Sequence, residues 1–171
     1  GFARNLPWEL REVTDLNCGA TQLLFALSGG EQTRDFWPHL FELQYRVVIG
    51  ESLELSLTTT NVDTVEWAFT EALHSYLAVQ SIAASRLSGF SGHSYQDKLS
   101  IGRHLTAQKG DVVVTGELDR IYRTYINQAS PNVYVLFDSQ AERAINVEQS
   151  GNASTVVWNP WVAKARALAD F

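Results

Sequence analysis

Residues 41–49 read Phe41-Glu42-Leu43-Gln44-Tyr45-Arg46-Val47-Val48-Ile49, and this stretch decides the fold. Apolar side chains alternate with polar ones along most of it, which is typical of a β-strand with one buried face and one solvated face. The alternation returns over 53–58, after the turn signal Gly50-Glu51. Two alternating runs joined by a short glycine-containing turn predict an antiparallel β-hairpin.

Outward from this hairpin, the sequence predicts more strands and few helices. Strands are expected at residues 18–27, 67–79, 112–114, 133–137 and 144–148. Strict alternation favours antiparallel pairing, because it requires one buried and one wet face. Many strands with few helices predict an all-β fold, an antiparallel β-sandwich.

Two short helices are expected. One is a turn around residues 31–36, ended by Pro38. The other lies at the C-terminal end, where Asn159 is a favourable N-cap and Pro160 occupies the tolerated first helical position. No low-complexity run, charge block or repeat divides the sequence, so residues 1–171 are expected to form a single domain.

Composition excludes several classes of protein. Hydrophobic residues make up 45% and charged residues 19% of the 171 residues, which favours a globular chain over a disordered one. The net charge of -6 lacks the basic footprint of a nucleic-acid-binding protein, although a local Arg or Lys cluster can still bind phosphate. No segment approaches the ~20 apolar residues of a membrane span.

The single cysteine, Cys18, can form neither an intrachain disulfide nor a cysteine zinc site. We expect it to be a small buried side chain, and one free thiol fits a reducing compartment such as the cytoplasm. The four histidines have no metal-ligand spacing, so no metal site is expected. A Ser nucleophile elbow is also absent.

Two titratable residues are candidates for chemistry. His74 lies in an apolar run, where a histidine is commonly a satisfied core or surface residue, yet imidazole is also the side chain best suited to proton transfer near neutrality. Asp119 lies in Gly116-Glu117-Leu118-Asp119-Arg120-Ile121-Tyr122, which could be a charged loop. Alternatively, its carboxylate could hold sugar hydroxyls by charge-assisted hydrogen bonds.

Five stretches, in order along nearly the whole chain, resemble motifs of one family, the hexose-6-phosphate mutarotases or glucose-6-phosphate 1-epimerases. The matching residues are Gly1-Phe2-Ala3-Arg4 followed by Trp8, Ala72-Leu73-His74-Ser75-Tyr76, Gly89-Phe90-Ser91-Gly92 with Tyr95-Gln96-Asp97-Lys98, Asp119-Arg120-Ile121-Tyr122, and Val157-Trp158-Asn159-Pro160-Trp161 with Lys164-Ala165 and Ala169-Asp170. The last of these is the most specific. The resemblance implies an antiparallel β-sandwich of the galactose-mutarotase type, an isomerase that interconverts sugar-phosphate anomers without a cofactor.

The resemblance also implies roles for individual residues. Family sites use two His, an Asp and a Glu, and by position His74 is the second His and Asp119 the Asp. In the family picture, His74 protonates the ring oxygen and Asp119 orients hydroxyl groups. Arg4 is the candidate phosphate ligand, since its planar fork suits phosphate oxygens, and Asp97 and Lys98 are expected near the substrate.

The first His of the family belongs immediately before Gly1, and its Glu belongs after Ala169-Asp170. We therefore expect residues 1–171 to cover the central-to-C-terminal part of a mutarotase-like sandwich, and to be poorly active alone. A non-catalytic carbohydrate-binding module on the same scaffold is the main alternative, and a structural β-domain is a weaker one. The partner is expected to be a small sugar phosphate, with no nucleic acid and no membrane; the preferred hexose and the oligomeric state stay open.

Overall fold

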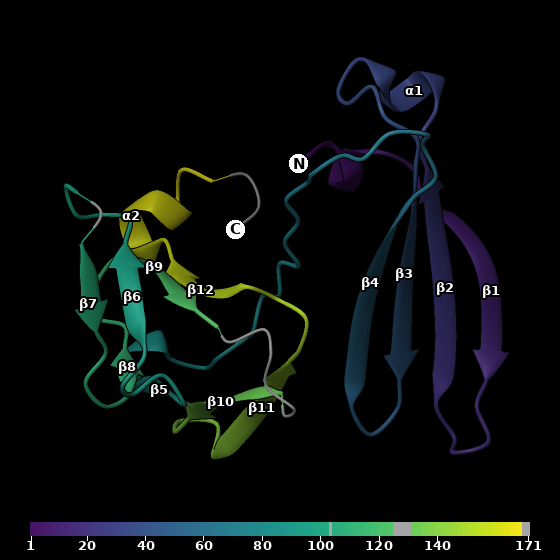
Figure 1. Ribbon diagram of the computed structural model, residues 1–171. Coiled ribbons are helices and arrows are strands. Elements are labelled where there is room, and N and C mark those ends of the chain that lie inside the picture. Colours follow the sequence, from purple (N-terminus) through teal and green to yellow (C-terminus); the bar gives the residue numbers. More distant parts are fainter. Residues whose placement is uncertain (103, 125–130, 169–171) are drawn as a thin grey trace. The chain divides into compact units, whose positions relative to one another are not determined.

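The computed structural model describes residues 1–102, 104–124 and 131–168, and it is mostly antiparallel β-sheet. The chain divides into two compact units, Gly1–His74 and Ser75–Phe171. Each unit is built around its own sheets (Figure 1). The all-β fold class is therefore confirmed, whereas the single domain stays a prediction, because it concerns how the two units pack together.

The first unit holds one four-stranded meander, which we call the first sheet, in the order β1-β2-β3-β4. Its strands are β1 (Glu9–Asp15), β2 (Thr21–Ser28), β3 (Phe41–Ile49) and β4 (Leu53–Asn61). The short helices η1 (Phe2–Asn5) and α1 (Glu31–Arg34) complete the unit. The predicted hairpin is β3–β4, in which Ile49 pairs with Leu53 and Phe41 pairs with Asn61.

Aromatic side chains cluster around the start of β3 in the first unit. Phe41 is only 1% exposed, and its ring lies 5.5 Å from Trp37 and 6.1 Å from Phe2. Trp67 packs edge-on against Trp37 at 4.6 Å between ring centroids. Rings in this tilted and edge-on geometry attract one another through their quadrupoles beyond the effect of burial alone.

The described residues of the second unit form two four-stranded sheets. The second sheet has the order β11-β10-β5-β8, and the third sheet has the order β12-β9-β6-β7. The strands are β5 (Ser85–Ser88), β6 (Ser94–Asp97), β7 (Leu105–Ala107), β8 (Val112–Val113), β9 (Leu118–Arg123), β10 (Asn132–Asp138), β11 (Arg143–Gln149) and β12 (Ser154–Asn159). The helices are η2 (Ile82–Ala84) and α2 (Trp161–Ala165).

Phe90 joins the two sheets of the second unit. Its ring stacks on Tyr134 of β10 at 4.1 Å and lies 4.3 Å from Tyr122 of β9. All three are at most 3% exposed and belong to one hydrophobic cluster with Val112 and Leu118. The second and third sheets therefore pack face to face as a β-sandwich around an aromatic core.

Two expectations from the sequence are wrong. Residues 67–79 were expected to form a strand, but their backbone pairs with no described strand. Their apolar side chains pack without strand pairing, as Trp67 does against Trp37. Cys18 is exposed, since it lies in the turn between β1 and β2, where Leu16 N–H bonds to the Ala20 carbonyl. That turn also delays the start of β2 from residue 18 to Thr21.

Candidate functional site

Asp119 is the second residue of β9, in the middle of the third sheet. Its neighbours along the strand, Leu118 and Tyr122, point into the aromatic core and are 6% and 0% exposed. Side chains alternate along a strand, so Asp119 lies on the face of the third sheet that is turned away from this core. The interpretation of this segment as a charged loop is therefore wrong.

Lys98 lies beside Asp119 on that same face. The Lys98 N–H donates to the Asp119 carbonyl at 2.9 Å, which extends the β6–β9 ladder by one residue. The Lys98 Nζ lies 3.9 Å from Asp119 Oδ2. The Asp119 side chain is only 19% exposed, whereas that of Lys98 is 54% exposed. A largely buried carboxylate therefore lies next to a solvent-accessible ammonium group.

Asp97 lies on the other face of the third sheet. It is directly opposite Arg120, and directly opposed residues of an antiparallel pair share a face. Its Oδ1 accepts the Leu99 N–H at 2.9 Å, which closes the turn after β6. In this structure Asp97 shapes the turn that carries Lys98, and a direct role at a substrate stays a prediction.

A buried amide that no sequence pattern singles out, Gln108, holds the core side of β9. Its Oε1 accepts hydrogen bonds from Tyr122 Oη at 2.8 Å and Arg120 Nη1 at 3.1 Å. The Arg120 guanidinium also lies over the Tyr95 ring, at 4.5 Å from its centroid. Burial raises the pKa of Tyr122, partly offset by Arg120, so its hydroxyl stays a donor at neutral pH.

The start of β9 is also tied to the C-terminal helix. Glu117 Oε1 accepts from Lys164 Nζ of α2 at 2.5 Å. Asn159 Oδ1 accepts the Trp161 N–H at 2.9 Å, but the N-cap of α2 is Pro160 and the helix begins at Trp161, so the expected N-cap at Asn159 and the expected first helical position at Pro160 are each one residue too early. Of the matched motif that ends the chain, Ala169-Asp170 lies outside the described residues.

Arg4 and His74 belong to the first unit. Arg4 lies in η1, where Trp8 Nε1 donates to the Ala3 carbonyl at 2.9 Å, and its exposed guanidinium forms no ion pair with a described residue. His74 is the last residue of the unit, in an exposed segment without regular structure. The five predicted site residues thus divide into Arg4 and His74 in one unit and Asp97, Lys98 and Asp119 in the other.

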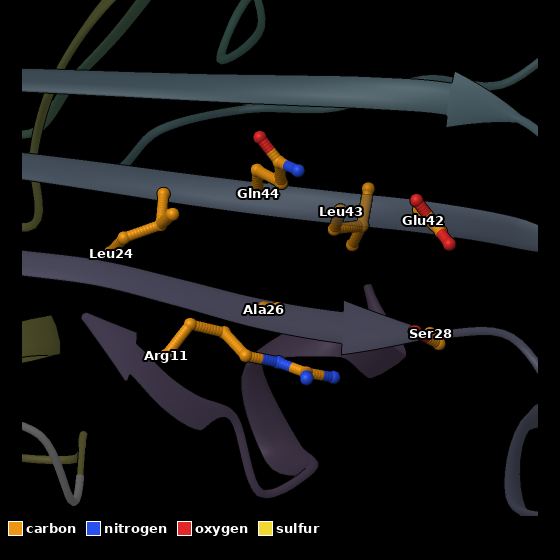
Figure 2. A pocket seen from close by; sticks show the side chains of 7 residues that line it. All are labelled: Arg11, Leu24, Ala26, Ser28, Glu42, Leu43 and Gln44. Atoms are coloured by element: carbon orange, nitrogen blue, oxygen red, sulfur yellow. The ribbon is translucent and has the colours of Figure 1, made fainter.

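A shallow pocket of about 290 Å³ lies on the polar face of the first sheet (Figure 2). Arg11 contributes to it from a β-bulge, where the pairing between β1 and β2 shifts by one residue. Its other lining residues are Leu24, Ala26, Ser28, Glu42, Leu43 and Gln44. None of the predicted site residues lines this pocket, and we assign it no part in the site.

Within residues 1–102, 104–124 and 131–168, no three His, Cys, Asp or Glu side chains are grouped so that they could hold a metal ion. Over the same part of the chain, no helix is long and apolar enough to cross a bilayer.

Comparison with curated proteins finds relatives along the whole chain. A protein from Cenchrus ciliaris named "putative glucose-6-phosphate 1-epimerase" is 33% identical over 179 residues, covering 100% of this chain and 53% of the relative. A Salmonella typhimurium protein of the same name is 34% identical over 170 residues, covering 99% of this chain and 54% of its own length. This chain therefore spans about half the length of the curated relatives it matches.

Solved structures show the same fold. The crystal structure of a "putative mutarotase" from Salmonella typhimurium superposes with a TM-score of 0.86 at 32% identity, covering 100% of this chain and 54% of that one. A galactose mutarotase-like protein from Clostridium acetobutylicum gives a TM-score of 0.67 at 12% identity over 93% of this chain and 54% of that one, which is a likeness of fold alone. The family model described as aldose 1-epimerase matches residues 1–171. The chain belongs to the aldose 1-epimerase family.

Proposed function

We propose that the protein carrying this chain interconverts the α and β anomers of a hexose 6-phosphate such as glucose 6-phosphate. The observation that carries the proposal is the aldose 1-epimerase match over all 171 residues. The names of the two curated relatives favour a phosphorylated glucose as substrate. The Asp119–Lys98 pair supports the same chemistry, because a carboxylate can accept sugar hydroxyls while a neighbouring ammonium attracts an anionic ligand.

The reaction requires two proton transfers. A base takes the proton of the anomeric O1 hydroxyl, an acid gives a proton to ring O5, and the C1–O5 bond breaks to the open-chain aldehyde. Rotation about the C1–C2 bond and ring closure with the reverse transfers give the other anomer. General acid–base groups typically contribute factors of ~10² to 10⁴ each.

In this proposal His74 is the acid that protonates O5, and Asp119 fixes the orientation of the sugar through its hydroxyl groups. The base is the family's Glu, which the resemblance places after residue 170. Imidazole suits the acid because it can give a proton to O5 as the ring opens and take it back as the ring closes. Asp119 suits orientation because β-strand pairing on both sides fixes its backbone.

Arg4 and Lys98 supply the proposed cationic contacts. Arg4 is exposed and has no carboxylate partner among the described residues, so its bidentate fork is available for a phosphate. Lys98 is a half-exposed point charge that can add attraction without fixed geometry.

Two-dimensional exchange NMR on glucose 6-phosphate tests the function. The full-length protein should accelerate exchange between the α and β C1 signals far above the uncatalysed rate, and free glucose should exchange more slowly at equal concentration. A protein that binds glucose 6-phosphate without changing the exchange rate would instead be a carbohydrate-binding module. A protein that neither binds nor exchanges it would contradict both.

A further inference from the structure

A row of three side chains crosses the outward face of the third sheet. Lys98 follows β6, Asp119 lies on β9, and Trp158 lies on β12, directly opposite Asp119 in the antiparallel pair. Opposed residues share a face and have Cβ atoms about 4.5–5.5 Å apart. The order across the sheet is therefore cation, carboxylate, indole.

The surroundings of Trp158 agree with this placement. Its strand neighbour Val157 packs against the aromatic core, so alternation turns Trp158 to the opposite face. The indole is partly exposed. The ends of β9 and β12 are both tied to α2 next to this pair, because Glu117 bonds to Lys164 of α2 and Asn159 accepts the N–H of Trp161, where that helix begins.

We propose that Trp158 packs its indole against the apolar C–H face of the pyranose whose hydroxyl groups bind Asp119. A pyranose carries hydroxyls around its edge and C–H bonds on its faces, and these surfaces match a carboxylate and an aromatic plane, respectively. One ring can meet both side chains because they are adjacent across the ladder. This inference rests on the proposed function, and it makes Trp158 a substrate-positioning residue.

Three variants of the full-length protein test the role. Trp158→Leu removes the aromatic plane, Trp158→Phe keeps a smaller one, and Val156→Ala changes the next side chain on the same face of β12, which is 54% exposed. For glucose 6-phosphate, Trp158→Leu should raise KM about tenfold with a smaller change in kcat, and Trp158→Phe should recover most of that loss. Val156→Ala should leave KM within about twofold of the wild type.

Calorimetric titration with glucose 6-phosphate separates failure of this inference from failure of the proposed function. Turnover with a wild-type KM in Trp158→Leu, or equal losses in Trp158→Leu and Val156→Ala, would overturn the stacking role and leave the function standing. Binding that weakens in Trp158→Leu and returns in Trp158→Phe, without turnover in the wild type, would support stacking and contradict the enzyme. Thermal melts of all three variants establish that each is folded.

Discussion

At the scale of single residues, Arg4 tests the phosphate half of the proposal. Its guanidinium is exposed and forms no ion pair with a described residue, so Arg4→Ala breaks no salt bridge among those residues. Charge-assisted hydrogen bonds contribute about 1.5–3 kcal/mol, so KM for glucose 6-phosphate should rise about 10- to 100-fold. KM for free glucose should change much less, because free glucose has no phosphate.

The exposed Arg34, on α1 of the same unit, provides the matched control. Arg34→Ala should alter KM for neither sugar. An Arg4→Ala variant that loses affinity equally for glucose and glucose 6-phosphate would remove the phosphate role from Arg4.

A second residue-scale prediction concerns Asp63. The backbone N–H groups of Leu40 (3.0 Å) and Thr64 (2.7 Å) bond to its carboxylate and, with His39 nearby, lower the pKa of Asp63 against a smaller opposing effect of desolvation. A lowered pKa stabilises the fold above the unfolded value of about 3.9, and this stabilisation is lost as pH falls through the lower folded value. Asp63→Asn should therefore melt below the wild type at about pH 6, and the gap should close towards about pH 2.

Thermal melts across that pH range check the prediction, with Asp35→Asn, an exposed carboxylate of the same unit, as the control. A gap between Asp63→Asn and the wild type that stays constant down to the lowest pH would show that its ionisation does not stabilise the fold.

At the scale of elements, β9 depends on a partner far away in the sequence. Gln108→Leu leaves the Tyr122 hydroxyl and the Arg120 guanidinium without their shared acceptor, at a cost of about 2–3 kcal/mol in the free energy of unfolding. Tyr122→Phe should cost about 1 kcal/mol. The double variant should be more stable than the sum of the two losses predicts, because the two deletions remove the same hydrogen bond.

Urea denaturation of the two single variants and the double variant measures this coupling. Strictly additive losses would contradict a shared hydrogen bond between Gln108 and Tyr122.

The elements also show what the sequence could and could not predict. The β3–β4 hairpin was predictable because its alternation needs only local information, and the structure pairs it as expected. Strand β9 was not predictable in this way, because Asp119 and Arg120 place charged side chains on both of its faces and so interrupt the alternation of apolar and polar residues. Among the described residues, Arg120 contacts Gln108 and Tyr95 on the core face, 12 and 25 residues away, and no local sequence pattern indicates those contacts.

The candidate site likewise combines features that local sequence could predict with features that depend on long-range pairing. Asp119 and Lys98 meet through backbone pairing between β6 and β9, which spacing alone could not have shown. Residue patterns gave His74 and Asp119 only as two of several candidates, and the resemblance to a family selected them. Trp158 stood in a quoted motif, yet only the register of β9 against β12 places it beside the carboxylate.

At the scale of the whole molecule, the proposed acid and the proposed orienting carboxylate come from different units, Gly1–His74 and Ser75–Phe171. The chain spans about half the length of its curated relatives, so the proposed activity belongs to the full-length protein. The aldose 1-epimerase match extends over both units.

The most direct test of that account is the α/β exchange rate of glucose 6-phosphate, measured by exchange NMR for the full-length wild type, His74→Asn and the control His104→Asn, another exposed histidine. The account predicts that His74→Asn slows catalysed exchange ~10²- to 10⁴-fold with an unchanged circular dichroism spectrum and melting temperature, and that His104→Asn keeps the wild-type rate. A His74→Asn protein that is folded and exchanges the anomers at nearly the wild-type rate would contradict it.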